Sequence, residues 1–118
     1  MGVQITRQER VGTLVVRVGG ELDVRTAGAF RDKVDELVAA SAQQRVVLNL
    51  SRVTFLDSTG LGAILGRVRR WKERDRQVVL VPPSGVARTV LDMAALGRTV
   101  AVYPSERAAL GEVAGIDG

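Results

Sequence analysis

The chain has 118 residues, of which 46% are hydrophobic and 25% charged. A chain of this size and composition folds into one globular domain with its own buried core. It contains no cysteine, which excludes a disulfide framework and a thiolate zinc site, and no histidine, the usual general base and the commonest metal ligand. We therefore expect one domain over residues 1–118 that is not an enzyme and uses no cofactor or metal.

Neither a membrane nor nucleic acid is an expected partner. No apolar run approaches the roughly 18 residues that a helix needs to cross a bilayer. The polar segment 1–10 is unlike a secretory signal, which predicts a cytoplasmic protein. The net charge is +4, and the densest basic stretch covers residues 67–76. Glu73 and Asp75 interrupt this stretch and aromatic residues are only 3% of the chain, which disfavours nucleic acid. The cations instead complement the negative end of a helix.

Apolar periodicity predicts strands and helices in alternation along the first two thirds of the chain. Val3 and Ile5 indicate a short strand, and the alternation over residues 14–18 predicts a second strand after a turn. Apolar residues at helical spacing predict a helix over residues 27–38. Another alternating segment predicts a strand over residues 46–50, and a helix that begins near Ser58 carries an apolar stripe as far as Trp71.

The last third of the chain repeats this alternation. Residues 78–81 form a short strand that Pro82 and Pro83 stop. Ser84 is an expected N-cap for a third helix through Met93, which Gly97 ends. A final strand over residues 100–103 precedes a terminal helix that Ser105 caps.

Alternating strands and helices predict an α/β fold with parallel strands and right-handed crossovers. Strands that are covered on both faces are usually continuous apolar runs. Two of the predicted strands instead carry Arg17 and Asn49 on their second face. We therefore expect the helices to pack mainly on one face of the sheet.

The segment LDSTGLGAILGR, from Leu56 to Arg67, is the most informative part of the sequence. Ser58 is a favoured N-cap, because its hydroxyl can meet free backbone N–H groups at the helix start. Gly60 and Gly62 each cost about 1 kcal/mol of helix propensity relative to alanine. Their lack of side chains would let another protein or a phosphate approach the first helical turn.

Three interpretations of this segment compete. A dinucleotide site is disfavoured, because the G-x-G-x-x-x-G spacing of Gly60, Gly62 and Gly66 departs from the fingerprint and prolines follow Val81 where an acidic residue should lie. In a purely structural interpretation, Ser58 is a cap and the glycines permit tight packing of the helix. In a regulatory interpretation, Ser58 accepts phosphate on an exposed helix start. The residues alone leave the last two open.

The segment Leu56–Arg67 resembles the characteristic segment of STAS domains, in particular of bacterial anti-sigma factor antagonists. GELD at Gly20–Asp23, followed by Thr26 and Ala27, resembles a second segment of that family. The spacing of the two segments also fits, as does the stretch 92–96. One departure is Ala95, where many relatives have glycine.

The resemblance implies a mixed, mostly parallel sheet with helices largely on one face, and partner switching in the regulation of transcription. The unphosphorylated antagonist binds an anti-sigma factor that is also a serine kinase, and thereby releases the sigma factor. The kinase phosphorylates the serine that corresponds to Ser58, and a PP2C-type phosphatase removes the phosphate. The expected contact residues are Asp23, Thr26, Asp57, Ser58, Thr59, Gly60, Leu61 and Gly62.

Several alternatives remain beside this hypothesis. The chain could be a STAS domain that acts as a scaffold or partner subunit in stress signalling or lipid transport. Asp23 could belong to the contact surface or cap the first helix. Thr59 could accept phosphate, although the resemblance aligns the acceptor with Ser58. Arg67 is expected on a solvated face of its helix and not in catalysis.

Overall fold

The computed structural model describes residues 2–85, 98 and 100–115, and in them one sheet of five strands in the order β1-β2-β3-β4-β5. β1 and β2 pair antiparallel, and every later neighbouring pair is parallel, so the sheet is mixed and mostly parallel as predicted. The strands are β1 Val3–Arg10, β2 Thr13–Leu22, β3 Arg45–Leu56, β4 Gln77–Val81 and β5 Ala101–Val102.

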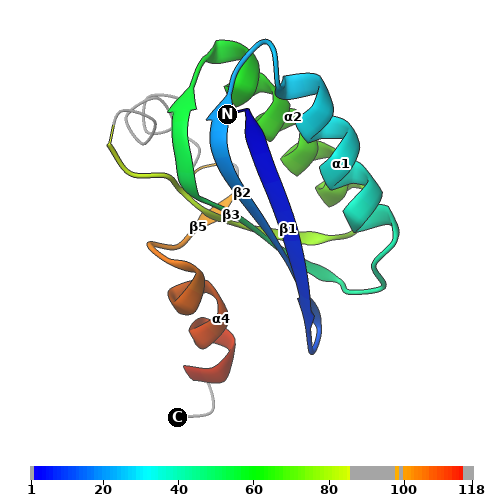
Figure 1. Ribbon diagram of the computed structural model, residues 1–118. Coiled ribbons are helices and arrows are strands. Elements are labelled where there is room, and N and C mark those ends of the chain that lie inside the picture. The colour runs from blue at the N-terminus through cyan, green and yellow to red at the C-terminus, as the bar shows by residue number, and fades with distance from the viewer. Residues whose placement is uncertain (1, 86–97, 99, 116–118) are drawn as a thin grey trace.

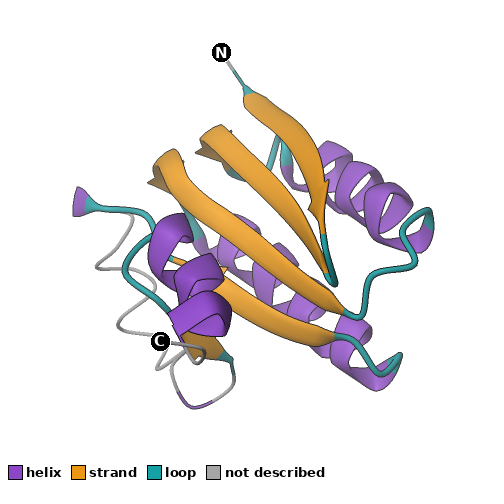
Figure 2. Cartoon of the chain, turned by 90° about the horizontal axis from the view of Figure 1, so that it is seen from below, coloured by secondary structure: helices purple, strands orange, loops and turns teal. Residues whose placement is uncertain are grey.

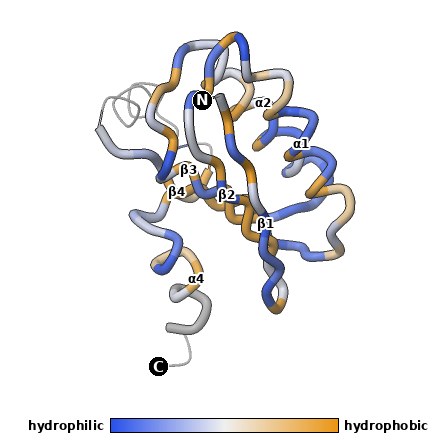
Figure 3. The backbone as a smooth tube through the Cα atoms, in the orientation of Figure 1, coloured by the Kyte–Doolittle hydropathy of each residue, from blue (hydrophilic) through white to orange (hydrophobic). Residues whose placement is uncertain are grey.

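Helices α1 (Ala27–Ala39) and α2 (Ser58–Glu73) lie side by side on one face of the sheet (Figure 1). Both helices turn the predicted apolar stripe toward the sheet, although Leu61 and Leu65 of α2 are only half-buried. The main core lies between them and the sheet, where Phe30, Val34, Ile64 and Val68 are fully buried. Figure 3 shows the hydrophobic segments gathered where the strands and these helices meet.

Helix α4 (Glu106–Gly115) lies against the other face of the sheet (Figure 2). Ala109 is fully buried there, in a smaller cluster with Val15, Val47 and Val79. Ser105 caps the helix as predicted, because its Oγ accepts a hydrogen bond of 3.0 Å from the Ala108 N–H. The expectation of helices mainly on one face is confirmed, with α4 covering part of the second face.

The polar residues on the second face bind α4. The Arg17 guanidinium donates to both carboxylate oxygens of Glu106, at 2.8 and 2.7 Å, and the Asn49 Nδ2 donates to Glu106 Oε1 at 2.7 Å. The Asn49 Oδ1 accepts from the Ser51 N–H at 2.9 Å, which fixes the amide. Arg17 and Asn49 are therefore the docking points of α4 on the sheet.

Four predicted strand boundaries were wrong. The third strand does not end at Leu50 but continues to Leu56, because β3 stays paired with β2 through two register shifts that the apolar alternation hides. β1 is longer than the short strand predicted at Val3, β2 continues past the predicted 14–18 to Leu22, and β5 has only two residues. The predicted third helix through Met93, with Ala95 and Gly97, lies outside the described residues.

We expect Glu106→Ala to lower the free energy of unfolding by about 1–3 kcal/mol, the cost of removing charge-assisted hydrogen bonds that leave partly buried donors without an acceptor. Urea denaturation would measure the change. Glu73→Ala is the matched control, because Glu73 is an exposed glutamate of α2 and substitutions at such sites stay within about 0.5 kcal/mol. Equal losses in both variants would contradict the docking role of Glu106.

The same ion pair gives a pH dependence. The hydrogen bond from Arg17 holds the pKa of the Glu106 carboxyl below its usual value, and the hydrogen bond from Asn49 acts in the same direction. The contribution to stability is therefore complete above the unfolded-state pKa of about 4.3 and is lost as the pH falls through the lower folded-state pKa. We expect the stability advantage over Glu106→Gln to be constant from pH 7 to pH 5 and to shrink at lower pH, as measured by urea denaturation at each pH.

Candidate functional site

The candidate site lies at the end of the sheet where β2 and β3 terminate and α2 begins (Figure 1). Asp57 joins these elements. Its Oδ1 accepts from the Gly60 N–H at 2.8 Å, and its Oδ2 accepts from the Val24 N–H at 3.1 Å. The Asp57 N–H donates to the Leu22 carbonyl at the end of β2, at 3.3 Å. One residue therefore holds the helix start, the strand end and the turn before α1 together.

The prediction that Ser58 is the N-cap of this helix was wrong. Asp57 has the extended backbone and the side-chain hydrogen bond of an N-cap, and Ser58 is the first helical residue. Ser58 is exposed, and its hydroxyl makes no hydrogen bond to any residue that the structure describes. Asp57 takes the capping role, so the hydroxyl of Ser58 is available for chemistry.

The two glycines of the first turn have different environments. Gly60 is buried, and a Cβ atom on it would lie 2.1 Å from the Leu22 carbonyl oxygen. Gly62 is exposed, and a Cβ atom there would meet nothing within 4 Å. Close packing of helix on sheet, which the sequence left as one interpretation, therefore explains Gly60. The side of the first helical turn that faces solvent lies at Gly62.

The GELD segment spans the end of β2, with Gly20–Leu22 in the strand, and Asp23 opens the turn before α1. The Asp23 Oδ1 accepts from the N–H groups of Arg25 and Thr26, and Thr26 Oγ1 donates to the Glu21 carbonyl at 2.8 Å. Asp23 is buried, and the Arg25 guanidinium, 3.0 Å from Oδ2, holds the pKa of this carboxyl below its usual value. Asp23 does not cap α1, whose N-cap residue is Thr26 and makes no side-chain capping bond. Its role is to order the turn.

The structure brings the two predicted segments together through the hydrogen bond between Val24 and Asp57. Of the predicted contact residues, Ser58, Thr59 and Gly62 are exposed. Asp57, Leu61 and Thr26 are half-buried. Asp23 and Gly60 are buried, so their influence on a partner would act through the geometry of the surface.

Two residues of this surface were missed by the sequence analysis. The side chains of Val24 and Phe55 are large hydrophobic groups with 69% and 48% of their surface exposed. Val24 follows Asp23 in the turn, and Phe55 lies two residues before Asp57 near the end of β3. The sequence contained a sign that Val24 is exposed, because it is an apolar residue in an otherwise polar turn. It contained no such sign for Phe55, because a strand of unknown length could have buried that side chain.

The residues that the structure describes contain no group of three side chains that could hold a metal ion. Within the same residues, no helix is both long and apolar enough to cross a bilayer. The surface at this end of the sheet presents the exposed hydroxyl of Ser58 and the exposed apolar side chains of Val24 and Phe55. Surfaces that combine apolar and polar groups in this way are typical of protein–protein contacts.

Comparison with known proteins assigns the fold to a family. The family model of the STAS domain matches residues 3–109, and the chain belongs to this family. The "Anti-sigma F factor antagonist" of Paenibacillus polymyxa is similar in sequence. It is 33% identical over 113 residues, which are 96% of this chain and 97% of that protein.

Solved structures agree. An anti-sigma factor antagonist from Mycobacterium paratuberculosis matches with a TM-score of 0.79 and 29% identity, over 95% of this chain and 94% of that one. The antagonist SpoIIAA in its unphosphorylated form matches with a TM-score of 0.73 and 28% identity, over 95% and 97% of the two chains. The phosphorylated form of SpoIIAA from Bacillus matches with a TM-score of 0.68 and 28% identity, over 93% and 99%.

We expect the two glycines to respond oppositely to substitution. Gly60→Ala should destabilise the fold by at least about 1–3 kcal/mol, because the methyl group would overlap a backbone oxygen that cannot move without shifting β2. Gly62→Ala should be neutral or stabilise by up to about 1 kcal/mol, since the methyl meets open space and alanine favours the helix. Thermal melts of both variants would measure this contrast, and similar melting temperatures would contradict the packing described for Gly60.

Proposed function

We propose that this chain is an anti-sigma factor antagonist that binds an anti-sigma factor serine kinase and so releases a sigma factor, and that phosphorylation of Ser58 abolishes the binding. The contact is the switch surface, which we define as Ser58, Thr59 and Gly62 in the first turn of α2 together with Val24 before α1 and Phe55 near the end of β3. A PP2C-type phosphatase would restore the unphosphorylated form. The names of the relatives support the antagonist role.

One observation carries the proposal: Ser58 is exposed at the first position of α2, and its hydroxyl has no partner among the described residues. A kinase needs a serine whose oxygen is accessible and not committed to the fold. Val24 and Phe55 lie at the same end of the molecule and are two of the four large hydrophobic side chains that are exposed in the described chain. Exposed apolar groups beside the acceptor fit a protein partner better than a small polar ligand.

The helix start allows the phosphate to act without unfolding the domain. A phosphoserine carries a charge of about −1.5 to −2 at pH 7, and the N-terminus of a helix favours negative charge. The existence of a phosphorylated form of SpoIIAA that matches this fold supports the same view. The phosphate changes the switch surface instead. It places charge and volume beside the half-buried carboxylate of Asp57, where a partner would have to desolvate both groups.

The central test is a titration of Ser58 variants against the kinase that copurifies with the protein from its native cell. Ser58→Ala should bind as tightly as the wild type, because it adds neither charge nor volume and Asp57 still caps α2. Ser58→Asp should bind at least about tenfold more weakly, a difference of 1.4 kcal/mol. Ser58→Asn is the matched control, since it has the size of aspartate without the charge, and it should keep most of the affinity.

Circular dichroism should show that all three variants remain folded. If folded Ser58→Asp binds as tightly as Ser58→Asn, charge at this position does not control the contact and the switching mechanism is wrong. Binding by none of the folded proteins, wild type included, would favour a STAS domain with a scaffolding role.

The acceptor itself can be identified by mass spectrometry after incubation with the kinase and ATP. We expect one phosphate on Ser58 and none on Ser58→Ala. Thr59 is the strictest competitor, because it is the next residue and is also exposed. Stoichiometric phosphate on Thr59 would refute the assignment to Ser58 while leaving the contact surface possible.

A further inference from the structure

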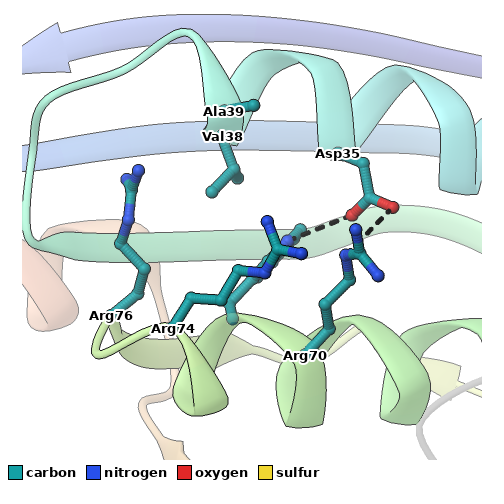
Figure 4. A pocket seen from close by; sticks show the side chains of 7 residues that line it. Asp35, Val38, Ala39, Arg70, Arg74 and Arg76 are labelled. Carbon is teal, nitrogen blue, oxygen red and sulfur yellow. Dashed lines mark hydrogen bonds and ion pairs between the residues drawn. The ribbon is translucent and has the colours of Figure 1, made fainter.

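A pocket of about 140 Å³ opens between the C-terminal parts of α1 and α2, at the opposite end of α2 from Ser58 (Figure 4). Its apolar lining comes from Val38, Ala39 and Trp71. Figure 4 shows three arginine side chains that extend from the end of α2 and the turn after it toward α1. These are Arg70, Arg74 and Arg76.

The charge of this pocket is not balanced by its own residues. Asp35 is the one carboxylate that lines it, and both of its oxygens are already engaged. Its Oδ2 pairs with Arg67, and its Oδ1 accepts from the Trp71 Nε1 at 3.1 Å. Arg70 approaches the same carboxylate only at 3.8 Å. Asp35 therefore neutralises Arg67, and the three arginines of the rim leave a positive excess.

The guanidinium groups also keep unused donors. Arg76 is held in place by hydrogen bonds from Nη1 to the Gln43 carbonyl at 2.8 Å and from Nη2 to the Ser41 carbonyl at 3.0 Å. A guanidinium has five N–H groups, so Arg76 retains three. The side chain of Arg74 makes no hydrogen bond or ion pair with any described residue. The rim thus combines one fixed guanidinium with one that is free to close on a ligand.

The ends of the helices do not cancel this positive charge. Carbonyls at a helix C-terminus are negative when they lack partners. Here the Trp71 carbonyl accepts from the N–H groups of Arg74 and Arg76, each at 3.0 Å, and the Lys72 carbonyl accepts from the Asp75 N–H at 3.0 Å. At the end of α1, the Val38 carbonyl accepts from the Ser41 N–H at 3.1 Å. The helix-end carbonyls therefore do little to offset the charge of the guanidinium groups.

We propose that this pocket binds a small phosphate-bearing anion, with Arg70, Arg74 and Arg76 as its ligands. Planar guanidinium forks match the oxygens of a phosphate group and can bind two of them at once. The volume of about 140 Å³ corresponds to about five water molecules at roughly 30 Å³ each, which is room for a phosphate group and little more. Trp71 is the one aromatic residue that lines this pocket and is only 2% exposed, so it offers little ring surface on which a nucleic acid base could stack.

A neighbouring pocket favours an anion with more than one phosphate. Arg76 also lines this second pocket, of about 420 Å³, together with Arg45 and Lys72. The Nη1 of Arg45 is buried and has no hydrogen-bond partner in the described chain. A buried donor of this kind normally has an acceptor. A second phosphate group that reaches past Arg76 would approach this additional positive charge, so pyrophosphate is the probe of choice.

The anion pocket and the switch surface are independent sites. Arg70 lies twelve residues after Ser58 on α2, and at 1.5 Å per residue these two positions are separated by roughly 18 Å along the helix. This distance exceeds the Debye length of about 8 Å at physiological ionic strength, so charges at one end are screened from the other. An anion and a protein partner can therefore be bound at the same time.

Calorimetric titration of the full chain with pyrophosphate tests the proposal. We expect saturable binding of one pyrophosphate, weakened at least about tenfold in Arg74→Gln and in Arg70→Gln, because each removes charge-assisted hydrogen bonds. Arg69→Gln is the matched control: it removes the same charge from an exposed position of α2 that does not line the pocket, and it should leave the affinity unchanged. Ser58→Asp should also leave it unchanged, whatever its effect at the switch surface.

Inorganic phosphate and ADP, titrated in parallel, identify the source of the phosphate. Equal affinity for ADP and pyrophosphate would support recognition of the phosphate groups alone, and tighter binding of ADP would extend the same site to nucleotides. Absence of saturable binding overturns the proposal. An equal loss of pyrophosphate affinity in Arg69→Gln and Arg74→Gln also overturns it, because it would indicate a diffuse attraction of the anion to the basic surface. Tighter binding of a single-stranded oligonucleotide that also depends on Arg69 would indicate a nucleic acid surface instead.

Discussion

The carboxylate of Asp57 is the constraint on which the arrangement of the site depends. It accepts one hydrogen bond from the first turn of α2 and one from the turn before α1, so two segments that are far apart in sequence are held at one end of the sheet. Gly60 makes this geometry possible, because any side chain there would strike the Leu22 carbonyl. With Asp57 as the cap, the fold makes no demand on the hydroxyl of Ser58. A change at the Ser58 side chain would thus leave the half-buried carboxylate of Asp57 free to hold the helix.

The periodicity of the sequence was enough to predict most of the architecture. The apolar stripes of α1 and α2 match the buried faces because both helices pack on a single layer, where a 3.6-residue repeat is all that burial requires. Arg17 and Asn49 correctly indicated that the second face of the sheet differs from the first. The exposed position of Ser58 also follows the prediction, since a polar residue at a helix start between strand and helix has no core to enter.

The remaining features depend on three-dimensional geometry that no periodicity contains. Asp57 and Ser58 are both good capping residues and are adjacent, so only the backbone conformation decides which one caps α2. β3 continues past Leu50 because it shifts its register against β2, and such a shift breaks the alternation by which strands are recognised. The basic stretch over residues 67–76 was predicted only to complement the negative end of a helix. Its pocket exists because Arg76 folds back onto the loop after α1, a contact between residues more than thirty positions apart.

The two edges of the sheet have a consequence for how this domain meets other molecules. An unpaired edge strand is a template on which a further strand can add, and in many proteins that is the route to aggregation or to peptide capture. Here β5 has only two residues, too few for a stable ladder. The C-terminal half of β1 exposes the charged side chains of Arg7, Glu9 and Arg10. A strand that paired with this half of β1 would have to desolvate these charges. Strand addition is discouraged at β5 and along the charged half of β1, which favours recognition through the helix ends and turns.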